Sequence, residues 1–156
     1  MKEAMAVGDI RNFLAIDERL ATAGQPSDAQ LADVAADGFE VVINLGLLGQ
    51  EYSLADEAGL ATSLGLDYYH IPVDFKAPTP SDMRKFLAVM DACAERKTLV
   101  HCAANYRATT FVSLYGQARL GWTPGEADAC AQHFWEPNEI WSAFRRRARV
   151  ELELAK

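Results

Sequence analysis

Short apolar, β-branched runs alternate along the chain with segments whose apolar residues recur every three or four positions. Runs of the first kind predict buried strands, and segments of the second kind predict amphipathic helices. The predicted strands span residues 19–25, 39–45, 67–73 and 97–102, and the predicted helices span 27–37, 53–65, 79–95, 107–121, 123–134 and a last stretch from Pro137 to 153. This alternation predicts an α/β fold, a three-layer sandwich in which helices flank a mostly parallel sheet of four to five strands.

Capping signals set the ends of several predicted helices. Ser27 and Gln30 have the spacing of a capping box, and Gly38 is placed to end the helix that they begin. Thr79 precedes a proline at the first helical position and an acid at the third, and residues 123–126 repeat this pattern. These helices therefore have defined starting points.

Length and charge narrow the classes of partner. At 156 residues the chain is expected to form one domain, residues 1–156. A net charge of −7 argues against nucleic acid or an anionic membrane as a partner. The first thirteen residues lack the pattern of a secretory signal, which predicts a cytoplasmic protein. The arginines in 145–149 are interpreted as the solvated end of the last helix.

Three cysteines without CxxC spacing are expected to be free thiols. Cys93 lies on the apolar side of its predicted helix, so we interpret it as a core residue. Cys130 lies three residues before His133, but no complementary pair of ligands occurs elsewhere, and it too is assigned to the core. His70 has no evident partner. We therefore predict neither a metal nor any other cofactor.

The segment "TLVHCAANYRATT", residues 98–110, is different. Cys102 follows a predicted strand and precedes a helix, at the edge where parallel sheets bind ligands. Free backbone N–H groups of residues 103–108 would surround an anion, and the positive helix end favours the thiolate of the cysteine. Arg107 offers a planar fork for two phosphate oxygens, and Thr109 can hydrogen-bond the sulfur. Together these groups describe nucleophilic attack on a phosphoryl group.

Several other residues near this segment have two possible roles. Asp74 lies past a strand end and is the best candidate for a general acid, or it caps a turn. His101 either braces the loop through hydrogen bonds, which we expect, or acts as an acid or base. Tyr106 either contacts substrate at the rim or packs under the next helix. Gln25 and Asn44 either face the same pocket or serve as a turn residue and a strand-end residue. The three tryptophans are assigned to packing of the C-terminal helices.

The stretch "YHIPVDFKAPTPSDM…LVHCAANYRAT" resembles the dual-specificity branch of the protein tyrosine phosphatases. "RLATAGQPSDAQLADVAADGFEVVINL", with its Gly-Gln-Pro motif, is similar to a bacterial subgroup of that superfamily, also found fused to metallo-β-lactamase-like hydrolase domains. The resemblance spans about residues 19–121. It implies a phosphatase-like fold with Cys102 as nucleophile, Arg107 as clamp and Asp74 as general acid. The residues expected to bind substrate are His101, Ala103, Ala104, Asn105, Tyr106, Ala108 and Thr109.

The cysteine loop departs from the phosphatase pattern. The family places five residues with a central glycine between cysteine and arginine, whereas four residues and no glycine separate them here. Asn105 can adopt the left-handed conformation that glycine would supply. Thr109 keeps the hydroxyl seven residues after the cysteine, and Ala108 replaces the usual serine or threonine after the arginine.

Three functions follow. The leading one is a cysteine-dependent hydrolase of phosphate monoesters, acting on a phosphorylated protein or small molecule, with phosphate or sulfate able to occupy the loop. A rhodanese-like sulfurtransferase fits the short loop, and its persulfide chemistry would not need Asp74. A non-catalytic oxyanion-binding module would keep the anion site without turnover.

Overall fold

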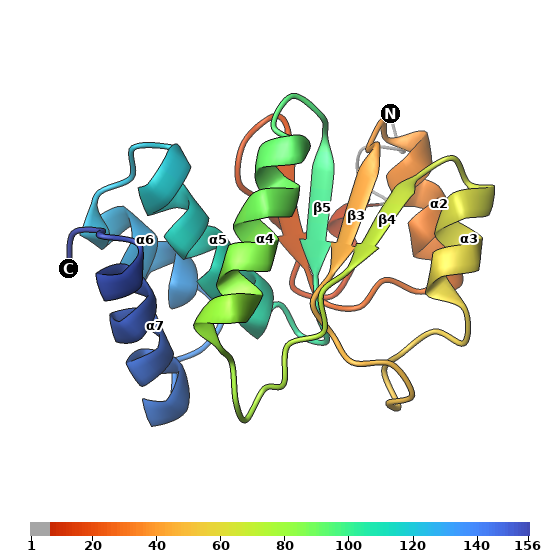
Figure 1. Cartoon of the computed structure of the whole chain (residues 1–156). Helices are drawn as coiled ribbons and strands as arrows, with labels where there is room; N and C mark the ends of the chain where they lie inside the picture. Colours follow the sequence, from red (N-terminus) through yellow and green to blue (C-terminus); the bar gives the residue numbers. More distant parts are fainter. Residues whose placement is uncertain (1–6) are drawn as a thin grey trace.

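A five-stranded sheet runs through the centre of the molecule in the computed structural model, which describes residues 7–156 (Figure 1). Its strands lie in the order β1-β2-β5-β3-β4, where β1 is Leu14–Ala15, β2 Leu20–Ala23, β3 Val41–Asn44, β4 Asp67–His70 and β5 Thr98–His101. β1 pairs with β2 in antiparallel orientation, and the other pairs are parallel. The predicted α/β class and mostly parallel sheet are confirmed.

Helices cover both faces of this sheet (Figure 1). They are α2 (Asp28–Ala36), α3 (Glu57–Ser63), α4 (Pro80–Ala92), α5 (Tyr106–Arg119), α6 (Pro124–Ala131) and α7 (Glu139–Glu151). The helices α2 and α3 lie on one face, α4 and α5 on the other, and α6 and α7 pack outside α5 and α4. No helix within residues 7–156 combines the length and the apolar character needed to cross a bilayer.

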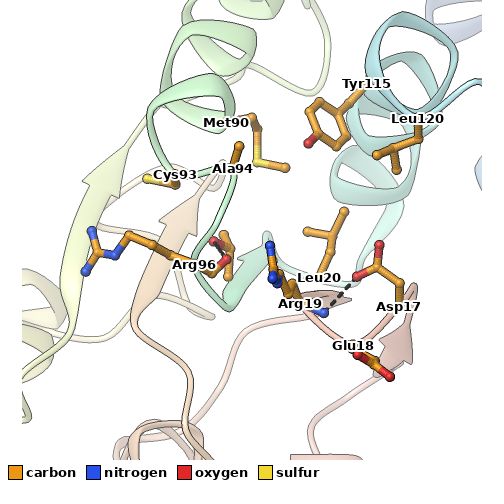
Figure 2. A pocket seen from close by; sticks show the side chains of 11 residues that line it. Asp17, Glu18, Arg19, Leu20, Met90, Cys93, Ala94, Arg96, Tyr115 and Leu120 are labelled. Atoms are coloured by element: carbon orange, nitrogen blue, oxygen red, sulfur yellow. Dashed lines mark hydrogen bonds between the residues drawn. The ribbon is translucent and has the colours of Figure 1, made fainter.

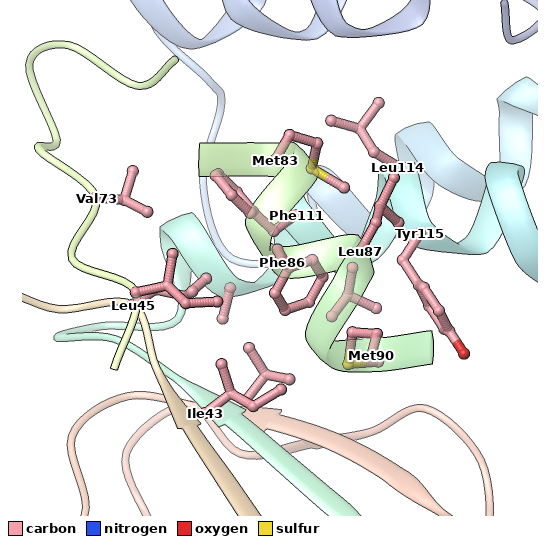
Figure 3. Close-up of a cluster of buried hydrophobic side chains, with 14 of the residues drawn as sticks. Ile43, Leu45, Val73, Met83, Phe86, Leu87, Met90, Phe111, Leu114 and Tyr115 are labelled. Atoms are coloured by element: carbon pink, nitrogen blue, oxygen red, sulfur yellow. The ribbon is translucent and has the colours of Figure 1, made fainter. Parts of the chain in front are cut away.

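Alternation along the strands divides the core into two parts. Val42 packs toward α2 and α3, whereas its neighbours Val41 and Ile43 pack toward α4 and α5. On this second face, Phe86 of α4 meets Phe111 of α5 edge to face, with ring centroids 5.5 Å apart (Figure 3). The central strands are thus buried on both sides, which explains why their sequences are continuously apolar.

The predicted caps are present, and some predicted boundaries are wrong. Capping boxes begin α2, α4 and α6, and Gly38 follows α2 with a φ of 94°. α3 begins only at Glu57, because the Asp56 side chain caps it by accepting a hydrogen bond from the N–H of Gly59. α7 begins after Asn138 rather than at Pro137, since the Asn138 side chain accepts a hydrogen bond from the N–H of Trp141.

The thiols of Cys93 and Cys130 lie in the hydrophobic core, as predicted. Cys93 and Cys130 are both buried. Burial raises the pKa of the Cys130 thiol to about 11, which keeps it protonated and unreactive at neutral pH. His133 packs edge-on against Phe134.

The arginines of α7 are not all solvated, so the prediction for residues 145–149 is partly wrong. Arg145 is buried and donates to the Asp128 carboxylate at 2.7 Å, and Arg149 reaches the same oxygen at 2.9 Å. Burial raises the pKa of Asp128, but hydrogen bonds from Arg149 and Arg145 outweigh it and hold this pKa below its ordinary value. One carboxylate therefore ties α7 to α6.

Asp128→Asn is expected to lower the free energy of unfolding by about 1–3 kcal/mol, because it leaves the buried Arg145 without its carboxylate. The pKa of Asp128 is lower in the folded state than in the unfolded state. The stabilisation by its carboxylate is therefore complete above about pH 4, and it is lost as the pH falls through the folded-state pKa. Thermal unfolding at pH 7 and at pH 3 measures it. The matched control is Asp91→Asn, whose partner Arg119 is exposed and should contribute less than about 1 kcal/mol. Equal effects of both variants at pH 7 would contradict the expectation.

Candidate active site

Cys102 lies where β5 ends and α5 begins, at the carboxyl edge of the sheet (Figure 1). We call residues 102–106 the cysteine loop. β5 is flanked by β2 and β3, so the loop emerges from the middle of the sheet. The side chain of Cys102 is buried at the base of the loop, with 1% of the residue exposed.

Three consecutive carbonyls of the cysteine loop point outward. The carbonyl of Cys102 lies 3.3 Å from Nδ1 of His101, that of Ala103 accepts from the N–H of Gln25 at 3.0 Å, and that of Ala104 accepts from Nδ2 of Asn12 at 2.9 Å. In a trans peptide the C=O and the following N–H point in opposite directions, and the described residues contain no cis peptide. The N–H groups of Ala103 and Ala104 are therefore directed to the inside of the loop.

The start of α5 adds further donors. Within residues 7–156, no backbone carbonyl accepts a hydrogen bond from the N–H groups of Tyr106, Arg107 or Ala108. These are the donors that the first turn of a helix leaves unpaired. Together with those of Ala103 and Ala104 they are a set of free donors of the kind that binds anions at helix N-termini, and we call this set of N–H groups the cradle.

Asn105 makes the turn that the missing glycine would make. Its φ of 71° and ψ of 13° lie in the left-handed region, as predicted. Its side-chain amide donates to the carbonyl of Asn12 at 2.7 Å and to the hydroxyl of Thr22 at 2.9 Å. Asparagine tolerates this backbone conformation, and the two hydrogen bonds hold it there.

The backbone of the Gly24-Gln25-Pro26 motif packs directly against the cysteine loop. Gly24 forms an isolated bridge with Ala104, and a Cβ on residue 24 would lie 2.6 Å from the carbonyl oxygen of Ala103. Only glycine permits this approach of two backbones. The side chain of Gln25 turns the other way and donates to Glu57 at 2.9 Å.

His101 and Glu57 form a fully buried pair behind the loop. Nε2 of His101 lies 2.5 Å from Oε2 of Glu57, and both side chains are at most 2% exposed. Burial raises the pKa of Glu57, but the hydrogen bond and charge of His101, with the Gln25 hydrogen bond, outweigh burial and hold this pKa below its ordinary value. His101 braces the loop as expected. Glu57 was not predicted, because its sequence position shows only the first turn of a helix.

Arg107 joins the two segments that flank the cysteine loop. It is 5% exposed, and Nη1 donates to the carbonyl of Val73 at 2.8 Å while Nη2 lies 3.4 Å from the hydroxyl of Tyr52. The guanidinium carbon lies 6.0 Å and 5.8 Å from the ring centroids of Tyr52 and Phe75. These contacts use two of its five N–H donors, and three remain for an oxyanion.

Two predicted residues bond within their own segments. Asp74 is exposed, and its carboxylate accepts from the N–H of Lys76 at 2.9 Å, which is the turn-capping role. It directly follows Val73, so its segment is tied to Arg107. The hydroxyl of Thr109 donates back to the carbonyl of Asn105 at 2.9 Å rather than to the sulfur.

Three aromatic side chains, Tyr106, Trp135 and Phe75, pack together beside the cysteine loop, and we call them the aromatic wall. Tyr106 stacks on Trp135 with centroids 4.7 Å apart and an interplanar angle of 3°, and Trp135 also contacts Phe75. Trp135 thus packs on the cysteine loop as well as on the C-terminal helices. Asn44 faces away from the loop, since its amide bonds to the hydroxyl of Tyr68 and the N–H of Gly46.

Two cavities lie near the sheet edges. One of about 430 Å³ opens at the amino ends of β2 and β5, with Cys93 and Tyr115 among its lining residues, and shares no residue with the cysteine loop (Figure 2). Another cavity, of about 530 Å³, is lined by Glu57 and His70 among others.

Residues 11–119 match the family model described as "Beta-lactamase hydrolase-like protein, phosphatase-like domain". The chain belongs to this family. The match includes the Gly-Gln-Pro motif, Asp74 and the whole cysteine loop, and it ends at the last residue of α5.

Relatives of known sequence carry the same family description. The chain is 38% identical to a beta-lactamase hydrolase-like protein of Agrobacterium fabrum over 109 residues, which are 68% of this chain and 25% of the relative. A Xylella fastidiosa protein of that description is 33% identical over 64% of this chain and 23% of its own length. This beta-lactamase hydrolase-like phosphatase domain thus spans about a quarter of these relatives.

Solved structures confirm the phosphatase fold. A candidate phosphatase of the DUF442 group from Shewanella putrefaciens superposes with a TM-score of 0.86 at 31% identity, covering 94% of this chain and 97% of the other. Pseudomonas aeruginosa TpbA, solved in complex with pTyr, superposes with a TM-score of 0.71 at 18% identity, covering 90% and 86%. The predicted resemblance is thus confirmed for the family and for the fold.

Gly24→Ala is expected to displace the cysteine loop, because its Cβ would meet the Ala103 carbonyl at 2.6 Å. Such overpacking lowers the free energy of unfolding by about 1–3 kcal/mol. The rise in melting temperature on adding phosphate should shrink as well. Gly125→Ala is the control, since its Cβ meets nothing closer than 3.9 Å. A Gly24→Ala variant with the native response to phosphate would show that the contact does not shape the cradle.

Proposed function

We propose that the chain hydrolyses phosphate monoesters through a phosphocysteine at Cys102. Family membership and the phosphatase fold support a phosphatase in general. The observation that carries the specific proposal is the cradle, in which outward carbonyls direct unpaired N–H groups around one buried thiol. Such donors stabilise the charge that the transferring phosphoryl group carries in the transition state.

The reaction has two steps. The Cys102 thiolate attacks phosphorus, the bond from phosphorus to the ester oxygen breaks, and the departing oxygen takes a proton from Asp74. Water then attacks the phosphocysteine with Asp74 accepting its proton, and the thiolate leaves as inorganic phosphate forms. Asp74 must release the N–H of Lys76 to take this role. The turn that it would leave is short, because the N–H of Ala77 donates back to the carbonyl of Asp74 itself.

The substrate is proposed to be a phosphorylated protein or small molecule with an aromatic or flat group beside the phosphate. The wall of Tyr106, Trp135 and Phe75 would contact such a group. The complex of TpbA with pTyr makes an aryl phosphate the first substrate to test.

Release of p-nitrophenol from p-nitrophenyl phosphate between pH 5 and pH 8 tests the proposal. Cys102→Ser should abolish turnover, because the hydroxyl is a far weaker nucleophile than the thiolate. Asp74→Asn should lower kcat at least about tenfold, since the leaving group loses its acid. Asp33→Asn on α2 is the matched control and should keep the native rate. Turnover that survives Cys102→Ser would reject the phosphocysteine.

A rhodanese-like sulfurtransferase is the second candidate. Two observations favour it, the four-residue loop and the engagement of the Asp74 carboxylate with Lys76 instead of the cradle. Cys102 would attack the outer sulfur of thiosulfate, expelling sulfite and forming a persulfide, and cyanide would then take that sulfur as thiocyanate and restore the thiolate.

Thiocyanate formation from thiosulfate and cyanide separates these candidates. A sulfurtransferase should require Cys102 and be unaffected by Asp74→Asn, which is the reverse of the phosphatase expectation for Asp74. If phosphate raises the melting temperature while both reactions fail, the oxyanion-binding module is the remaining function.

A further inference from the structure

The turn that precedes β1 lies beside the cysteine loop. A hydrogen bond from the N–H of Phe13 to the carbonyl of Ile10, at 3.0 Å, closes this turn. Ile10 is 2% exposed and belongs to the part of the core that faces α2 and α3. The carbonyl of Arg11 accepts from the N–H of Gly24 at 2.7 Å. The turn is therefore anchored both in the hydrophobic core and on the motif that packs against the loop.

Two asparagines join this turn to the cysteine loop by reciprocal hydrogen bonds. Nδ2 of Asn12 donates to the carbonyl of Ala104 at 2.9 Å, and Nδ2 of Asn105 donates to the carbonyl of Asn12 at 2.7 Å. Both acceptors are carbonyls, which cannot donate, so the nitrogen of each side-chain amide must face them. Both asparagines have a positive φ, 50° for Asn12 and 71° for Asn105. We call this pair of hydrogen bonds the asparagine clasp.

The clasp explains what asparagine contributes at position 105. Glycine would adopt the same φ without steric cost. Asn105 is fully buried, and within residues 7–156 its Oδ1 has no hydrogen-bond partner, which is unfavourable. Glycine would leave no such oxygen in the core. The favourable contribution of this side chain is therefore its amide nitrogen, which bonds to Asn12 and to Thr22.

The clasp fixes a peptide that lies between two donors of the cradle. These donors are the N–H groups of Ala104 and Tyr106, and the peptide between Ala104 and Asn105 separates them along the chain. Asn12 holds the carbonyl of that peptide. Donors that are aimed before the anion arrives bind it more tightly, because ordering them during binding would lower the affinity.

We propose that Asn12 is a positioning residue of the active site, and that the clasp sets the affinity of the cradle for phosphate. Asn12 acts through the Ala104 carbonyl, by keeping the donors of the loop and those of α5 in fixed positions relative to each other. The inference rests on the proposed function only in taking the cradle as the site of the phosphoryl group.

Asn12→Gly tests the proposal, because glycine keeps the positive φ and removes only the side-chain amide. The Ala104 carbonyl then loses its donor. The dissociation constant for inorganic phosphate, measured by isothermal titration calorimetry at pH 7, should rise about three- to tenfold, which is the range that one hydrogen bond contributes. A folded Asn12→Gly protein with the native dissociation constant would overturn the proposal.

Two control variants separate positioning from stability. Glu153→Gly places glycine at another residue of positive φ, 57°, which lies beyond the end of α7. Asp128→Asn weakens the fold at the contact between α6 and α7. Both variants should bind phosphate with the native dissociation constant. A rise in either as large as that in Asn12→Gly would overturn the proposal, because stability or the glycine itself would then account for the loss.

Asn105→Gly removes the other half of the clasp and covers the case in which Asn12→Gly does not fold. It keeps the turn and should weaken phosphate binding by a similar factor, so native binding by this variant would contradict the clasp. The double variant should bind about as weakly as the weaker single variant, since changes within one hydrogen-bond network are not additive. Losses that multiply would show that the two side chains act independently and would overturn the clasp.

Phosphate binding requires no turnover, so this inference and the proposed function fail separately. Weakened binding by Asn12→Gly, with no hydrolysis of p-nitrophenyl phosphate by the native protein, would reject the proposed function alone. Turnover that depends on Cys102, together with native phosphate binding by Asn12→Gly, would reject this inference alone.

Discussion

The close contact between the backbones of residues 24 and 103–104 is the constraint on which the active site depends. A loop that presents its N–H groups inward must place its carbonyls outside, and those carbonyls need donors when they are buried. The donors come from three directions, namely the Gln25 backbone, the Asn12 side chain and the His101 ring. The absence of a side chain on Gly24 lets the first of these approach.

This arrangement explains how a loop with four residues between cysteine and arginine can still form an anion cradle. Asn105 takes the left-handed conformation at the position where the chain turns into α5. Its own side chain is bonded to Asn12 and Thr22, so the turn is fixed from outside. Loop shape is thus determined by the neighbouring segments as much as by the residues of the loop.

The sequence predicted the features that depend on local pattern. Alternating strands and helices gave the fold class, capping boxes gave the starts of α2, α4 and α6, and the tolerance of asparagine for positive φ gave the conformation of residue 105. Each of these depends on a few neighbouring residues, for which short-range energetics decide the structure.

The features that it did not predict depend on long-range contacts. Strand β1 has two partly exposed residues and no readable alternation. Glu57 reaches His101 across 44 positions and Asn12 reaches Ala104 across 92, and no local signal marks either residue. Arg145 was expected in solvent because it belongs to a run of arginines at the end of its helix. The prediction failed because its partner, Asp128, lies on another helix.

The aromatic wall is built from two parts of the chain, one inside the stretch that matches the family and one after it. Tyr106 and Phe75 lie inside the stretch that matches the family, whereas Trp135 and Trp141 lie beyond its end at residue 119. Trp141 donates to the carbonyl of Phe75, so the segment after residue 119 also holds Phe75 in place. The cysteine loop and part of the aromatic surface beside it therefore come from different stretches of the sequence. A relative that continues differently after α5 would place other side chains beside the same cysteine loop.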